Sequence, residues 1–248
     1  MTGPDPGAAA LDALTAAGPF FAVAAHGADG PPPGRPWRPL SEVVTDPAVL
    51  PRRIDEVRAH LAGAAGQPAD GVERRVAASV AHLGLVARVL SPFFALAALG
   101  CTPRVPTLSG LYWIPVPGGA FPLSLPRASL AGRGGAVPES AAPVLDGLVA
   151  PLTEAVAGLR VPRRTLWGNA ASAVNGARAA LVAALPHAGD LAARTARVFL
   201  EHPALRGTFE DSGGAAPFRR RSCCLIYRAL PGTDRAAAVC GDCVLAGR

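Results

Sequence analysis

The sequence predicts an α+β fold that is mainly α-helical: a helical body with a short central β-hairpin and a small C-terminal hairpin module. Three observations lead to this prediction. Apolar residues recur at helical spacing over most of the chain. A stretch at 105–126, broken by prolines and glycines, contains the β-branched and aromatic residues that favour strands. Four of the five cysteines fall in the last twenty-six residues.

The composition indicates a folded protein without a nucleic-acid partner. The chain has 248 residues, half of them apolar, which is enough for one large domain or two small ones. Its formal charge is +6, and all 24 basic residues are arginine. Abundant alanine, glycine, proline and arginine are typical of a GC-rich coding sequence. Since no basic stripe with interleaved aromatic residues is present, we expect no binding to DNA or RNA.

The first hundred residues predict mostly helices. Ile54, Val57 and Leu61 recur at helical spacing, with Asp46 placed to cap that helix. Pro92 predicts a kink or a restart in a later apolar helix. The predicted elements are a helix at 1–19, a strand at 20–25, a Pro/Gly loop at 27–42, and helices at 47–64, 70–90 and 93–99.

The second half begins with the predicted hairpin, whose turn is placed at 117–119. A glycine-rich loop at 131–138 follows, and then helices at 140–159, 164–185 and 188–201. We therefore divide the chain into a helical body at 1–206, a linker at 207–217 and a C-terminal module at 218–248.

No targeting or membrane segment is predicted. The N-terminus lacks a basic region, and Asp5 and Asp12 interrupt its alanine-rich start. The most apolar stretch, 76–100, contains His82 and Arg88, so we interpret it as a buried helix. We expect a cytoplasmic protein, in which reduced cysteines indicate metal or redox chemistry.

The cysteines form a vicinal pair, Cys223 and Cys224, and a C-x-x-C pair, Cys240 and Cys243, with fifteen residues between them. "LIYRAL" (225–230) predicts a strand, and a Pro-Gly turn at 231–232 lies midway between the pairs. A hairpin with its tip there brings four thiolates together, as zinc or an iron–sulfur cluster requires.

The vicinal pair favours a cluster over zinc, without excluding zinc. Zinc sites usually use C-x(2–4)-C pairs, and neighbouring strand side chains point to opposite faces. The backbone must therefore bend at Cys223-Cys224, or the two sulfurs must bind different metal atoms. A [2Fe–2S] cluster is extended and tolerates the second arrangement.

"RRRSCCLIYR" and "CGDCVL" resemble the C-terminal signature of the FhuF-type ferric siderophore reductases. "LWGNAASAV" (166–174) and "VARVLSPFFALAALG" (86–100) also resemble segments of that family. The resemblance implies a [2Fe–2S] cluster whose ligands are Cys223, Cys224, Cys240 and Cys243. One departure is that the family usually has ten residues between the inner cysteines. The additional residues fall around "GTDRAAA" (232–238), at the predicted hairpin tip.

The resemblance implies a cytoplasmic reductase that transfers one electron to Fe(III) in a hydroxamate-type siderophore and so releases Fe(II). No nucleotide-binding motif is present, so we expect an external electron donor such as a ferredoxin. Gly241 lets the backbone approach the cluster, and Asp242 is expected to lower its potential. Two alternatives are a zinc-stapled helical binding protein without redox activity and a sensor that retains the cluster.

Five further residues are candidates for substrate binding. Arg219, Arg220 and Arg221 are placed to attract an anionic chelate or an acidic donor, or else form a solvated linker end. Trp167 and Asn169 either shape a substrate groove or pack and cap a helix. We interpret Cys101 and His82 as buried core residues.

Overall fold

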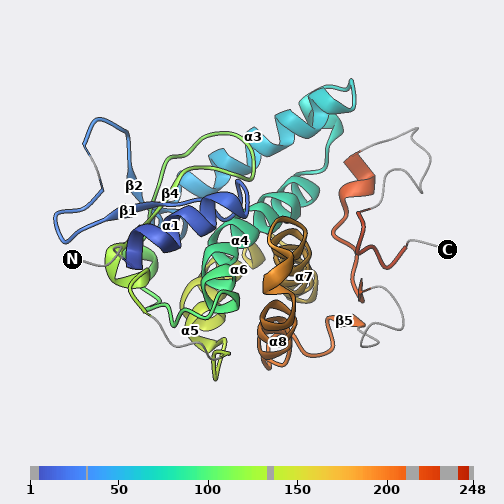
Figure 1. The fold of residues 1–248 in the computed structure, drawn as a ribbon. Coiled ribbons are helices and arrows are strands. Elements are labelled where there is room, and N and C mark those ends of the chain that lie inside the picture. The colour runs from blue at the N-terminus through green and yellow to red at the C-terminus, as the bar shows by residue number, and fades with distance from the viewer. Residues whose placement is uncertain (1–5, 32, 133–136, 211–217, 230–239, 246–248) are drawn as a thin grey trace, which may run out of the picture.

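The computed structural model describes residues 6–31, 33–132, 137–210, 218–229 and 240–245. It is mainly helical with two small sheets, which confirms the predicted fold class (Figure 1). The helices are α1 (Pro6–Ala16), α2 (Glu42–Thr45), α3 (Val49–Ala64), α4 (Arg74–Ala98), α5 (Ala142–Val144), α6 (Ala150–Ala157), α7 (Arg163–Ala184) and α8 (Gly189–Leu200). A π-helical turn (Leu145–Val149) joins α5 to α6, and short 3-10 turns occur at Ala69–Gly71, Leu108–Gly110, Arg127–Ser129, Pro186–Ala188 and Ile226–Ala229.

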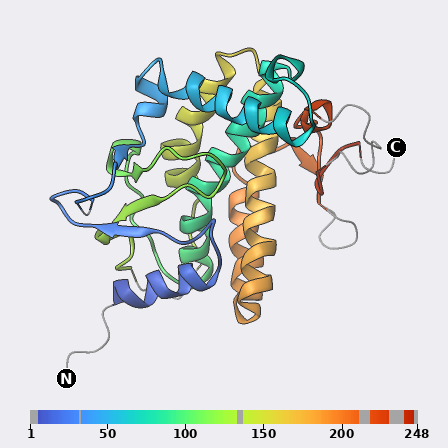
Figure 2. The same cartoon turned by 90° about the horizontal axis from the view of Figure 1, so that it is seen from above.

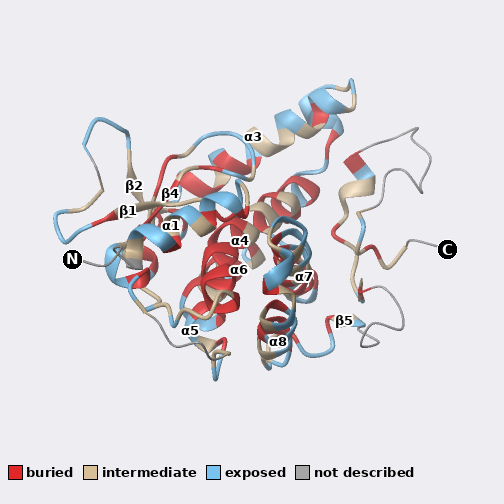
Figure 3. Cartoon of the chain, viewed as in Figure 1, coloured by how far each residue is buried: buried red, intermediate tan, exposed pale blue. Residues whose placement is uncertain are grey.

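The core is organised around α4, which packs against α3, α6, α7 and α8. Its last ten residues, 89–98, are all buried (Figure 3). Among the described helices, α4 alone is long and apolar enough to cross a membrane, but 78% of that apolar window is buried inside the protein. The other helices therefore cover the apolar surface of α4, as expected for the central helix of a folded core.

The helix restart predicted as one possibility at Pro92 is wrong, because α4 continues through this residue. Proline in a helix interior removes one hydrogen bond and costs about 3 kcal/mol. Here the turn is buried on all sides, and Ser91 Oγ donates a hydrogen bond to Ala87 O at 2.6 Å. Tertiary packing outweighs the local preference. The cap is closer to expectation, since Asp46 Oδ1 accepts a hydrogen bond from Ala48 N immediately before α3.

The larger sheet has the strand order β1-β4-β3-β2. Its strands are β1 (Ala24–His26), β2 (Arg38–Pro39), β3 (Tyr112–Trp113) and β4 (Leu123–Pro126). Strands β3 and β4 are antiparallel and form the predicted central hairpin, whereas β1 pairs with β4 in parallel. The strand predicted at 20–25 begins later, because Phe21 and Ala22 donate their N–H groups to Gly18 O in a turn.

Arg88 attaches this sheet to α4. Arg88 is 2% exposed, and its guanidinium donates hydrogen bonds to Phe121 O, Phe20 O and Ala22 O at 2.8, 2.9 and 2.6 Å. Burial lowers the pKa of Arg88 to about 10, so the side chain stays charged at neutral pH. Seen from above, the sheet lies on one side of the helices and the C-terminal segment on the other (Figure 2).

Candidate metal centre

The C-terminal segment is held against the body by a short sheet. Strand β6 (Arg219–Arg220) pairs in an antiparallel manner with β5 (Phe209–Glu210). Phe209 and Phe218 stack with ring centroids 5.3 Å apart. The predicted linker at 207–217 therefore includes β5 at its start. Its remaining part, 211–217, lies outside the described residues.

The C-x-x-C loop returns to the same strand. Arg220 N donates a hydrogen bond to Asp242 O at 3.0 Å, which places this loop beside β6. The predicted strand "LIYRAL" is wrong for Ile226–Ala229, which form a 3-10 turn. The proposed hairpin tip and its returning arm, 230–239, lie outside the described residues.

The four cysteine thiols are close together. Cys224 Sγ and Cys240 Sγ are 3.7 Å apart. The thiol of Cys223 hydrogen-bonds that of Cys224, and Cys243 interacts electrostatically with both Cys223 and Cys240. Cys224 and Cys243 are buried, whereas Cys223 and Cys240 are partly exposed. The fold thus brings the two cysteine pairs together, although fifteen residues separate them in the sequence.

The backbone turns sharply directly after the vicinal pair Cys223-Cys224, where the sequence predicted a bend as one of two possibilities. Leu225 has φ +73°, a left-handed conformation that is rare for a leucine. Its N–H donates to Cys223 Sγ at 3.2 Å, and Leu245 N donates to Cys243 Sγ at 3.3 Å in the second loop. Both loops therefore direct backbone N–H groups at sulfur, which stabilises thiolates.

The pKa values of three of the thiols are shifted in opposite directions. Hydrogen bonds from Cys223 and Cys240, together with the charge of Arg220, lower the pKa of Cys224 well below its usual range. The same hydrogen bond to Cys224 raises the pKa of Cys223, and that between Cys224 and Cys240 raises the pKa of Cys240. Burial disfavours the charge of Arg220, but the neighbouring Cys224 and Cys240 outweigh burial and raise its pKa. Arg220 and the neighbouring thiols therefore favour the thiolate form of Cys224.

Helix α7 supplies the surface on which this segment rests, through Gly168, Asn169, Ser172 and Asn175, which we call the α7 contact strip. Ser172 Oγ and Asn175 Nδ2 both donate hydrogen bonds to the Asp242 carboxylate, the latter at 3.1 Å. A Cβ at Gly168 would lie only 2.6 Å from Ser222 Oγ, so the Ser222 side chain would have to move to admit a larger residue. The strip therefore positions both cysteine loops.

Asn169 connects the centre to the core. Its Nδ2 donates to Ser79 O at 3.0 Å and faces Ser79 Oγ and His82 Nδ1 at 3.2 and 3.5 Å, while its Oδ1 accepts from Arg220 Nη1 at 2.6 Å. His82 Nε2 lies 3.1 Å from Thr153 Oγ1, which donates to Val149 O. His82 Nε2 therefore carries the proton and Nδ1 accepts. This assignment leaves one consistent orientation for the Asn169 amide.

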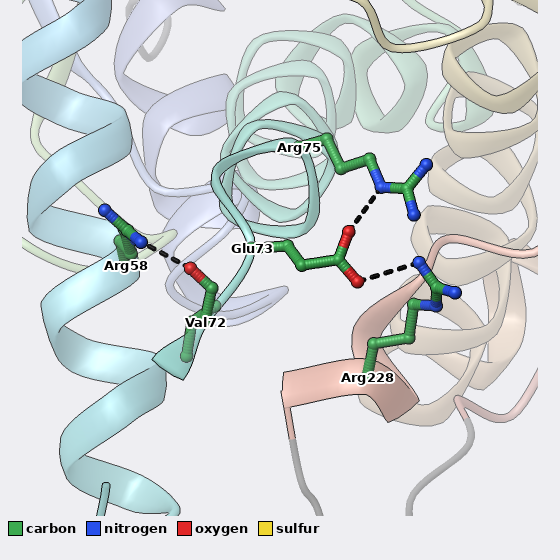
Figure 4. A network of polar contacts seen from close by, with 5 residues as sticks. All are labelled: Arg58, Val72, Glu73, Arg75 and Arg228. Carbon is green, nitrogen blue, oxygen red and sulfur yellow. Dashed lines mark hydrogen bonds and ion pairs between the residues drawn. The ribbon is translucent and has the colours of Figure 1, made fainter. Parts of the chain in front are cut away.

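A second set of contacts holds the other side of the segment (Figure 4). Glu73 accepts hydrogen bonds from Arg75 at 2.6 Å and from Arg228 at 2.8 Å. Gln67 Nε2 donates to Ala229 O at 2.9 Å. A small apolar cluster forms beneath these contacts; its members are Leu61, Ala62, Val72, Val76, Leu225 and Ala229. The segment is thus fixed to the α3–α4 corner as well as to α7.

The candidate substrate residues occupy different environments. Arg220 and Asn169 are buried, and both belong to the network described above. Arg219 is partly buried in β6, and Arg221 is exposed and pairs with Glu210 at 3.4 Å. Trp167 packs against the main core. His82 is fully buried, as predicted, and Cys101 packs against the core while remaining partly exposed.

The sequence pattern did not single out Ser172, Asn175 or Gln67. The first two were detectable, because Gly168, Ser172 and Asn175 recur at i, i+4 and i+7 and so form a small and polar stripe on one helix face. Gln67 left no such signal, since its partner is a backbone carbonyl 162 residues away.

Residues 220–245 match the family model of the FhuF 2Fe-2S C-terminal domain. The C-terminal segment is therefore similar to the FhuF-type iron–sulfur domain. The matched range contains all four clustered cysteines, and the cofactor of this domain is a [2Fe–2S] cluster. Comparisons with curated proteins and with solved structures gave no match.

The residues of the FhuF-type domain fit this cofactor. Two thiolates on one tetrahedral metal, at metal–sulfur distances of about 2.3 Å, lie roughly 3.8 Å apart, close to the Cys224–Cys240 separation of 3.7 Å. In the described part of the chain, no three His, Cys, Asp or Glu side chains form a single-ion site. The buried Arg220 Nε has no partner among the described residues. A cluster sulfur is an acceptor of the kind that this N–H lacks.

Valine at Gly168 is expected to displace the FhuF-type domain from α7. Its branched side chain would collide with Ser222, and overpacking of this kind costs about 1–3 kcal/mol. Iron release to a chelator should therefore accelerate by roughly ten- to a hundredfold. Gly176→Val is the matched control, because Gly176 is exposed on the same helix with no atom within 4 Å of its added Cβ. Equal release rates in the two variants would contradict the contact strip.

Acid is expected to destabilise the protein through His82. Complete burial lowers the pKa of His82 to about 3, below its ordinary value of 6.5. Between these values the unfolded chain binds a proton that the folded protein excludes. Stability is therefore fully present above pH 6.5 and falls by about 1.4 kcal/mol per pH unit as the pH decreases toward 3.

Urea unfolding of the wild type, His82→Gln and the exposed-site control His60→Gln between pH 4 and 7 measures this effect. The pH slope should flatten only in His82→Gln. A slope that persists in this variant would assign the acid sensitivity to other groups.

Proposed function

We propose that this protein is a cytoplasmic ferric-siderophore reductase. It transfers one electron to Fe(III) in a hydroxamate-type siderophore and thereby releases Fe(II) for iron assimilation. The observation that supports the proposal most directly is a four-cysteine centre in an FhuF-type domain, assembled at one side of the helical body. We assign Cys223, Cys224, Cys240 and Cys243 as its ligands.

The chemistry follows from the charge of iron. Hard hydroxamate oxygens bind Fe(III) tightly and Fe(II) weakly, because the higher charge suits them better. A bound [2Fe–2S] cluster supplies one electron at a time, which matches the single electron that converts Fe(III) to Fe(II). The protein needs no direct bond to the substrate iron.

The exposure of the cysteines supports electron exchange at the surface. Cys223 and Cys240 are partly exposed, whereas Cys224 and Cys243 face the interior. Arg221 remains 47% exposed in its side chain despite its pairing with Glu210. Its positive charge beside the centre attracts an anionic chelate or an acidic donor such as a ferredoxin. Asn169 and Arg220 have no such access, and we assign them to the support of the centre.

A single-turnover experiment tests the proposal. Protein purified without oxygen is reduced with dithionite, desalted and mixed with a ferric hydroxamate siderophore and a dye that binds Fe(II). We expect the visible absorption of the oxidised centre to return with one Fe(II) captured per centre, and no capture with Cys224→Ser. A reduced centre that persists beside the ferric chelate would refute the proposed reaction. A colourless protein containing zinc would instead favour a zinc-stapled binding module.

A further inference from the structure

Arg220 is a fully charged side chain enclosed in the protein. It is 1% exposed, and such burial is costly unless the charge has partners. Its Nη2 donates to Cys240 Sγ at 2.9 Å and its Nη1 to Asn169 Oδ1 at 2.6 Å. Among the described residues, the anionic groups that interact with this guanidinium are the sulfurs of Cys224 and Cys240. Its positive charge is therefore directed at the cysteine centre.

The guanidinium is held from behind. Asn169 directs its Nδ2 toward Ser79 and His82 of α4, so its Oδ1 must face Arg220. A rotated amide would set two N–H donors against the guanidinium and leave the Ser79 carbonyl without this donor. Because Asn169 and Ser79 are fully buried in the body, the charge is fixed to the core rather than to a mobile surface.

Charge beside the centre affects reduction. A [2Fe–2S] cluster with four thiolates has a net charge of about −2, and reduction adds one more negative charge. A cation held in a low-dielectric interior stabilises the reduced form more than the oxidised form, which raises the potential. Asp242, which we expected to lower it, directs its carboxylate to Ser172 and Asn175 of α7. The positive charge of Arg220 therefore contacts a cysteine sulfur, whereas the negative charge of Asp242 is hydrogen-bonded to α7.

We propose that Arg220, held by Asn169, is the positioning residue that sets the reduction potential of the centre by fixing a buried positive charge against Cys240. The proposal depends on the bound cluster and not on the identity of the electron acceptor. The Nε–H of Arg220, which has no partner among the described residues, adds a donor on the same side chain.

The test is a redox titration of the cluster-loaded protein, followed by absorption and EPR, with no siderophore present. In Arg220→Gln we expect the equilibrium with a reference dye to shift at least tenfold against reduction, which is 59 mV for one electron. Arg220→Lys should recover part of the shift, because it keeps the charge. Arg221→Gln is the matched control for the reduction potential. It removes the same positive charge from the next residue, whose side chain is exposed to solvent.

Two outcomes would overturn the proposal: equal shifts in Arg220→Gln and Arg221→Gln, or a wild-type potential in a fully loaded Arg220→Gln protein. If Arg220→Gln takes up no cluster, Asn169→Ala decides. This variant leaves the guanidinium charged but removes its support, so a lowered potential supports the proposal and an unchanged one refutes it. Failure of siderophore reduction would not alter either result, because the titration measures the centre alone.

Discussion

Replacing Cys224 by serine is expected to abolish the visible absorption of the protein and leave the helical body folded. Cys224 is 1% exposed and hydrogen-bonds the thiols of both Cys223 and Cys240, so its loss removes the sulfur in the middle of the set. A serine hydroxyl is a poor substitute, because it stays protonated where a metal ligand must be an anion. The body retains its own core around α4.

Absorption, iron and acid-labile sulfide per chain, and far-UV circular dichroism measure this outcome together. Cys101→Ser is the control, since Cys101 packs against the main core and lies far along the chain from the centre. It should retain the full chromophore. Undiminished absorption in Cys224→Ser would refute its assignment as a ligand, and loss of helicity would show that the body depends on the centre.

Arg88→Met is expected to destabilise the body by about 3 kcal/mol or more. Methionine preserves much of the side-chain volume but leaves the carbonyls of Phe20, Ala22 and Phe121, the last of them buried, without their donor. For a chain of this size the melting temperature should fall by roughly 6–12 °C. Thermal unfolding followed by circular dichroism measures the shift.

Arg194→Met makes the same exchange at an exposed position of α8 and should change the melting temperature little. The effect of Arg88→Met should also be independent of cluster content, because the sheet and the cysteine centre lie on opposite sides of the helices. A destabilisation that disappears in the cluster-free protein would contradict this separation.

Periodicity was a reliable guide to the long helices. The helices predicted at 47–64, 164–185 and 188–201 correspond to α3, α7 and α8 within two residues at each end. Their apolar faces repeat often enough that any compact arrangement must bury them. Local rules failed where packing opposed them: α4 passes through Pro92, and Ile226–Ala229 forms a 3-10 turn although its residues favour a strand.

The cysteine centre, like the fold, was predictable from the sequence only in part. The clustering of four cysteines, their spacing and the resemblance of the flanking residues all predicted a C-terminal [2Fe–2S] domain, because ligand chemistry depends on residue types that the sequence displays directly. The roles of the surrounding residues did not follow from it. Three consecutive arginines look equivalent in sequence, yet Arg220 is buried beside Cys240 and Arg221 is exposed.

The sequence by itself therefore determined the mainly helical class, the long helices, the central hairpin and the chemistry of the cysteine segment. Only the tertiary structure decided which side chains support the centre. Asn169 meets Ser79 across 90 residues and Arg220 across 51, and Gln67 meets Ala229 across 162. Such contacts depend on how α4, α7 and β6 pack together. Pairing over that distance is set by the burial of whole helices, which no local pattern of residues specifies.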